Sequence, residues 1–149
     1  MRHLIPASVL TDVRTFMEDR GVHGLEAAAM LAGGSDGHIT RAVIPHQVGH
    51  RSELGVAVEV TQRGKLELVS ALGIHERWIA RIHSHPYNAF HSNTDDRNPA
   101  LTAEGSLSIV VPFFGLGLRG GIGACAVFVL RNGRWAEARP DDVLEVTHD

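Results

Sequence analysis

The stretch RIHSHPYNAFHSNTDDRN, residues 81–98, carries the strongest signal in the chain. His83 and His85 alternate at the end of an expected strand, so both imidazoles project to the same side and can share one cation. Pro86 prevents regular strand pairing from continuing and turns the chain into a loop. The tetrapeptide SNTD, residues 92–95, then fits the start of a helix, with its serine at the cap and an acid three residues later. Such a turn would bring a carboxylate back toward the two histidines.

This set of side chains is typical of a catalytic zinc site. Imidazole suits zinc, and three protein ligands leave one coordination position open for water or substrate. The sequence therefore predicts one Zn²⁺ ion per chain, held by His83, His85 and a nearby aspartate. The simpler alternative is a polar strand end that binds no metal. His91 could also contact the metal or the substrate, but it is more simply explained by packing in the loop.

The order His-x-His-Pro, a loop and Ser-x-x-Asp resembles the JAMM/MPN+ metalloproteases, a family that includes deubiquitinating enzymes and their prokaryotic relatives. Here the matching residues are 83–86 and 92–95, and the small bacterial members are the most similar. The family's usual spacing from the second histidine fits Asp96, whereas the spacing from the serine fits Asp95. We prefer Asp95 because one helical turn fixes its distance from Ser92, while a loop loses a residue at little cost.

The resemblance also implies roles for two residues outside the ligand set. The family has a glutamate on an early core strand, which points to Glu26 in GLEA, residues 24–27. Glu26 would act as the general acid and base, and the hydroxyl of Ser92 would donate a hydrogen bond to the oxyanion. Taken alone, Glu26 could equally be a surface-facing residue of a half-buried strand, although buried acids are rare unless paired or functional.

The function implied by the resemblance is an isopeptidase that hydrolyses the amide bond after the C-terminal glycine of a ubiquitin-like protein, by deconjugation or precursor processing. Expected partners are that protein or its conjugates, together with ubiquitin-activating-like and ubiquitin-conjugating-like enzymes. Residues 44–54 and the glycine-rich segment 115–120 are plausible docking surfaces. The alternative function is a catalytically inactive MPN-type binding or scaffold module.

A third reading, nucleotide binding, rests on GLGLRG, residues 115–120, which has the glycine spacing of a dinucleotide-binding loop. Such loops need a helix directly after the glycines. The following GIGACAVFVL instead indicates a strand, so the spacing is best read as a coincidence and the segment as a flexible loop between two strands.

The rest of the chain predicts an α+β fold with a mixed sheet flanked by helices, and the resemblance implies cytidine-deaminase-like layers. Apolar spacing and capping residues predict helices over 8–20 and 62–72, with Leu66, Val69 and Leu72 of the second facing inward. Residues 45–54 read as a loop. Strands are expected at residues 25–32, 38–44, 56–60, 78–83, 106–113, 124–130 and 134–138.

Bulk composition narrows the function classes. At 149 residues the chain is expected to form one domain, residues 1–149. A formal net charge of −3 without any Lys/Arg-rich block argues against nucleic acid as a partner. The single cysteine, Cys125, cannot form an intramolecular disulfide, and no apolar run suits a signal peptide or membrane span. The expected location is the cytoplasm, away from membranes.

Overall fold

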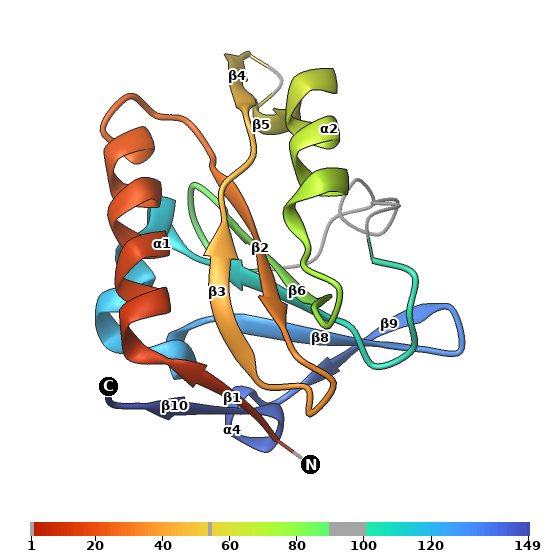
Figure 1. Cartoon of the computed structure of the whole chain (residues 1–149). Coiled ribbons are helices and arrows are strands. Elements are labelled where there is room, and N and C mark those ends of the chain that lie inside the picture. Colours follow the sequence, from red (N-terminus) through yellow and green to blue (C-terminus); the bar gives the residue numbers. More distant parts are fainter. Residues whose placement is uncertain (1, 54, 90–100) are drawn as a thin grey trace.

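The computed structural model describes residues 2–53, 55–89 and 101–149 (Figure 1). Within these residues, the sheet strands are β2 (Ala28–Gly33), β3 (Ile39–Val43), β6 (Arg77–Ser84), β7 (Leu107–Val111), β8 (Ala126–Arg131) and β9 (Arg134–Ala138). They form a six-stranded mixed sheet in the order β3-β2-β6-β7-β8-β9. The β6–β7 pair is parallel, and the other neighbours run antiparallel. The predicted α+β class with a mixed sheet flanked by helices is confirmed.

Helix α1 (Ala7–Gly21) packs on one face of this sheet and closes the main core. Its buried side chains Val9, Val13 and Met17 recur at intervals of four residues, as the sequence predicted. From the sheet, the core receives alternate side chains that include Ile82 and Ile109. Because alternate residues of a strand point to opposite faces, His83 projects away from α1.

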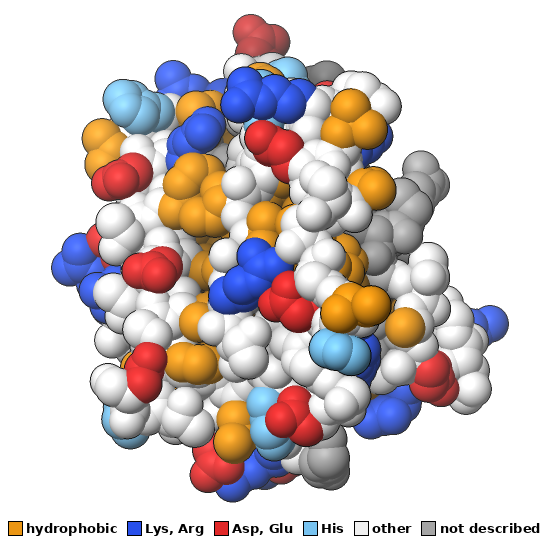
Figure 2. All heavy atoms as spheres, viewed as in Figure 1, with side chains coloured by type: hydrophobic (Ala, Val, Ile, Leu, Met, Phe, Trp, Pro, Cys, Tyr) orange, Lys and Arg blue, Asp and Glu red, His pale blue; other side chains and the backbone are white. Residues whose placement is uncertain are grey.

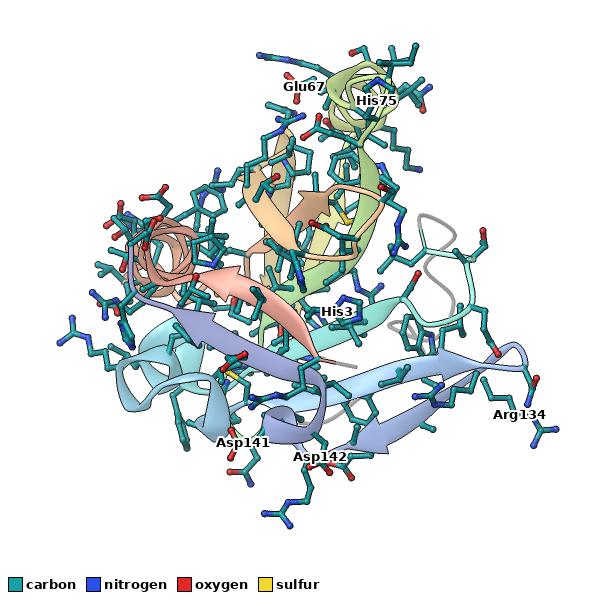
Figure 3. The ribbon with its side chains drawn as sticks, turned by 60° about the horizontal axis from the view of Figure 1, so that its bottom comes forward. His3, Glu67, His75, Arg134, Asp141 and Asp142 are labelled. Atoms are coloured by element: carbon teal, nitrogen blue, oxygen red, sulfur yellow. The ribbon has the colours of Figure 1, made fainter. Side chains whose placement is uncertain are left out.

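Two smaller sheets complete the described structure. Strands β1 (His3–Pro6) and β10 (Leu144–Thr147) pair in parallel and join the two ends of the chain (Figure 3). The short helix α4 (Pro140–Val143), marked by Asp141 and Asp142 in Figure 3, leads into β10. The second small sheet is an antiparallel hairpin of β4 (Gln47–Ser52) and β5 (Gly55–Val60).

The hairpin shows that the prediction of a loop over residues 45–54 was wrong. Residues Gln47–Ser52 form β4 and pair along their whole length with β5. The error has a physical cause: β4 is largely exposed, and only its first residue, Gln47, is buried. An exposed strand of this kind lacks the apolar alternation by which strands are recognised.

Helix α2 (Gln62–Ala71) begins where the sequence predicted it. Thr61 caps the helix, because its Oγ1 accepts a hydrogen bond from the backbone N–H of Gly64 at 3.1 Å. The inward orientation predicted for Leu66 and Val69 was wrong, since they are 60% and 82% exposed. The helix approaches the hairpin through Gly64 instead, where a Cβ atom would collide with the carbonyl oxygen of His46.

The apolar side of α2 therefore faces solvent, while Leu72 just after the helix is half-buried. Apolar side chains show at the surface over this helix in Figure 2. Across the described ranges, no helix combines the length and apolar character that crossing a membrane requires.

The glycine-rich segment adopts 3₁₀ turns, which differs from the predicted flexible loop. After β7 the chain forms η1 (Phe113–Gly120), and η2 (Ile122–Ala124) follows before β8. Strand β7 ends at Val111, two residues before the predicted end. Within this described segment, no α-helix follows the glycines. The segment therefore lacks the helix N-terminus that binds the pyrophosphate of a dinucleotide.

Candidate metal centre

The two histidines of the HSHP motif lie together at the end of β6. This strand is central, paired with β2 on one side and β7 on the other. His83 and His85 are 4% and 5% exposed. Their Nε2 atoms are 3.2 Å apart, and their ring centroids are 5.0 Å apart at an interplanar angle of 59°. The structure thus brings the two predicted ligands side by side in a shielded position.

The donor geometry of this pair fits a shared zinc ion. Two imidazole nitrogens on a tetrahedral zinc ion, each about 2.0–2.1 Å from the metal, are separated by about 3.3 Å. The 3.2 Å between the Nε2 atoms of His83 and His85 agrees with this separation. Imidazole pairs that converge through Nε2 atoms are also a common ligand arrangement for zinc.

Glu26 lies in the segment that leads directly into β2. It is 8% exposed, so the reading of a surface-facing glutamate is wrong. The predicted strand over residues 25–32 begins later, at Ala28, but its pairing with β6 continues toward Glu26. Ser84 extends that pairing: its N–H donates to the Ala27 carbonyl, and its Oγ accepts from the Ala27 N–H, both at 2.9 Å.

The register of this pairing places Glu26 beside the histidines. Ala28 is directly opposite His83, so continuing the antiparallel register by two residues puts Glu26 opposite His85. Residues that face each other across an antiparallel pair project to the same side of the sheet. The carboxyl group of Glu26 therefore belongs to the same face of the sheet as both imidazoles.

Sequence reasoning missed Gln47, which anchors the segment after Glu26. The side-chain amide of Gln47 accepts a hydrogen bond from the Ala28 N–H and donates one to the Ala28 carbonyl, both at 2.8 Å. It also donates to the Pro45 carbonyl at 2.9 Å. The pairing of β2 with β3 starts only at Met30. The buried Gln47 amide therefore satisfies the backbone groups of Ala28 that β3 does not reach. Nothing in the residue type signals this role, because it depends on where the β4–β5 hairpin folds back.

Replacing Gln47 with leucine is expected to destabilise the protein by about 2–4 kcal/mol, because the N–H and carbonyl of Ala28 both lose their partner. Urea unfolding monitored by circular dichroism measures this change. Val48→Ala is the control, since the neighbouring Val48 is 42% exposed and should contribute little. Equal midpoints for the two variants would contradict the anchoring role of Gln47.

Arg81 is a second residue that the sequence reasoning did not assign. It is 5% exposed and lies two residues before His83 on β6, hence on the same face of the sheet. Its Nη2 atom donates a hydrogen bond to the Ser108 Oγ at 3.1 Å. The apolar neighbours of Arg81 in WIARIH, residues 78–83, indicate that its side chain is buried. A buried guanidinium is rare without partners, so this pattern could have marked Arg81 as a residue with a role. Arg81 adds a permanent positive charge to the face that carries the histidines.

The remaining predicted site residues lie outside the described residues. These are Ser92, Asp95 and the alternative Asp96, together with His91. Within the described part of the chain, no three His, Cys, Asp or Glu side chains gather closely enough to hold a metal ion. The third ligand is thus still the prediction made from the Ser-x-x-Asp motif.

Cys125 belongs to the hydrophobic core and not to the site. It is 6% exposed and packs in the cluster that α1 closes. Burial raises the pKa of its thiol to about 12, because the charged thiolate would lose its hydration. The thiol is therefore protonated at neutral pH and poorly suited to act as a nucleophile.

Comparisons with known proteins agree with this fold. The chain is 35% identical over 116 residues to the probable metalloprotease y4jG of Sinorhizobium fredii, covering 74% of this chain and 70% of that protein. Two solved structures, each 15% identical, share the fold. A Desulfitobacterium hafniense protein solved in solution has a TM-score of 0.64 over 100% of this chain and 94% of its own. A JAB1/MPN domain protein from Archaeoglobus fulgidus has a TM-score of 0.52 over 98% and 97%.

No family model matches the chain. The fold is nevertheless that of the JAB1/MPN domains. In this chain, the HSHP motif begins at the end of the central strand β6. At this level of identity and coverage to a named metalloprotease, the chain belongs to the JAMM/MPN metalloprotease family.

Proposed function

We propose that the chain is a zinc-dependent peptidase of the JAMM type. The observation that carries this proposal is the convergence of the His83 and His85 Nε2 atoms, 3.2 Å apart, on the sheet face that also carries Glu26. His83, His85 and Asp95, with Asp96 as the alternative, would hold the ion. When bound, zinc makes hydroxide available from water at neutral pH.

The residues of the chain then have distinct tasks in the proposed hydrolysis. Glu26 takes a proton from the attacking water and later returns it to the departing amine. Its low exposure keeps bulk water from competing for that proton. The hydroxyl of Ser92 donates a hydrogen bond to the oxyanion that develops on the substrate carbonyl. No acyl-enzyme forms in this scheme, so Cys125 has no catalytic task.

The substrate we propose is the amide bond after the C-terminal glycine of a ubiquitin-like protein, either in a conjugate or in a precursor. The support is membership of a family that includes deubiquitinating enzymes. The partners would then include activating and conjugating enzymes of the same pathway, in the cytoplasm. Residues 44–54, which include the exposed strand β4, and the glycine-rich segment 115–120 are the surfaces that we propose for docking such a protein.

The experiment measures bound zinc in the purified protein and the cleavage of a ubiquitin-like fusion with and without chelator. We expect about one zinc ion per chain and turnover that chelation abolishes and added zinc restores. A chain that binds zinc but cleaves neither fusion nor peptide would instead support the inactive scaffold. Turnover that survives complete zinc removal would overturn the proposal.

Thiol reagents and the Cys125→Ala substitution are expected to leave kcat within about twofold of the wild-type value, because a thiol with a pKa of about 12 forms little thiolate at neutral pH. The measurement is fusion cleavage before and after alkylation of the native protein. Loss of activity in both the alkylated protein and Cys125→Ala would indicate a cysteine mechanism.

A further inference from the structure

The turn at the start of η1 has an unusual backbone. Phe113, Phe114 and Gly115 have φ angles of 56°, 53° and 93°, so three consecutive residues are left-handed. Two of them are phenylalanines, for which this conformation is sterically unfavourable. Such a conformation persists only when its surroundings enforce it, and strained backbone of this kind gathers at functional sites.

This turn binds the backbone of the HSHP motif. The N–H of Phe114 donates to the carbonyl of His85 at 2.7 Å, and the N–H of Phe113 donates to the carbonyl of Tyr87 at 2.9 Å. On its other side, the N–H of His85 donates to the carbonyl of Val111 at 2.8 Å. The peptide groups on both sides of His85 are therefore fixed by the segment 111–114.

His85 needs such support because it lies beyond the regular sheet. Strand β6 ends at Ser84, and Pro86 has no N–H with which to continue a ladder. The left-handed turn takes over where the strand pairing stops. His83, by contrast, lies within β6 and is paired with Ala28 and Val110.

Helix α1 packs tightly against this turn. A Cβ atom added to Gly21 would lie 2.6 Å from the Cβ of Phe114, and one added to Gly115 would lie 2.5 Å from the Cβ of Met17. Such distances leave no room for a side chain between helix and turn. Figure 1 shows the η1 coils beside α1, and Arg119 of η1 forms two hydrogen bonds with the Glu18 carboxylate, at 2.6 and 3.0 Å.

We propose that the Phe113–Gly115 turn, held against α1, is a positioning element that fixes His85 for metal binding. This inference rests on the proposed zinc site and adds residues that act on His85 through backbone hydrogen bonds. Its physical basis is that a zinc site tolerates only small displacements of its ligands, and that supporting contacts set ligand orientation. The strain of the turn is maintained by α1, and its release would let His85 move.

The test variant is Gly21→Ala, with Gly123→Ala as its control in η2. Alanine favours helix, so any loss in Gly21→Ala must come from the displacement of Phe114. Gly123 has nothing within 4 Å of an added Cβ. We expect Gly21→Ala to raise the zinc dissociation constant about 10–100-fold and to change the visible spectrum of the cobalt-substituted protein. Gly123→Ala should change neither.

Arg119→Gln is a milder second variant in case Gly21→Ala does not fold. It removes one exposed tether and should raise the zinc dissociation constant roughly two- to fivefold. Circular dichroism of the metal-free proteins confirms folding. Wild-type zinc affinity and cobalt spectrum in the folded variants would overturn the inference while leaving the zinc site intact. Failure of the unaltered chain to bind zinc would overturn the proposed site and this inference together.

Discussion

Glu26→Gln is expected to lower kcat about 10²–10⁴-fold without changing the zinc content of the purified protein. Glutamine has nearly the same shape as glutamate, but its amide cannot accept and return a proton at neutral pH. Glu26 is 8% exposed and lies opposite His85 when the register of β2 and β6 is continued. An acidic side chain at the surface therefore could not take over the proton transfer. The measurements are fusion-cleavage kinetics and zinc content by atomic absorption.

Glu137→Gln provides the matched control for this substitution. Glu137 lies on β9, is exposed, and belongs to neither proposed docking surface. It should retain both zinc and turnover. If Glu26→Gln and Glu137→Gln had the same kcat, another group would have to move the proton.

His83→Ala is expected to lose both zinc and measurable turnover. Even changes to groups that only orient a ligand weaken metal binding about 10–100-fold, so removing a ligand should weaken it by at least that much. The loss of zinc separates this variant from Glu26→Gln, in which the metal stays bound. Zinc content after dialysis and the rate of fusion cleavage measure the two effects.

His75→Ala is the control for the loss of an imidazole. His75 is exposed and follows α2, at the edge of the molecule seen in Figure 3. Full zinc content in His83→Ala would show that the ion binds elsewhere.

Separate Asp95→Ala and Asp96→Ala variants identify the third ligand, because only the loss of the true ligand should deplete the metal.

Local patterns in the sequence predicted much of this fold. The three- and four-residue spacing of apolar side chains located α1, and the cap at Thr61 located α2. The strands expected at residues 25–32 and 38–44 correspond to β2 and β3, whose hairpin closes with a hydrogen bond from the Gly37 N–H to the Gly34 carbonyl. Each of these features depends on residues that are close together in the sequence.

Non-local features were missed for the opposite reason. The β1–β10 pair joins residues 3–6 with residues 144–147, and no local pattern can indicate that pairing. The period of α2 showed which residues share a side but not whether anything covers that side, so Leu66 and Val69 were wrongly placed inward. Similarly, Gln47 and the Phe113–Phe114 turn act on backbone groups that only the folded chain brings near them.

The histidine pair was predictable because side chains two residues apart on extended backbone point to the same side, and His85 lies only one residue beyond the end of β6. The location of Glu26 on the same face of the sheet required the pairing of β2 with β6.

The most direct test of the zinc site is anomalous diffraction at the zinc edge from crystals grown with zinc. We expect one strong peak about 2.0–2.1 Å from the Nε2 atoms of both His83 and His85. A peak elsewhere, or imidazoles that point apart with zinc in excess, would contradict it.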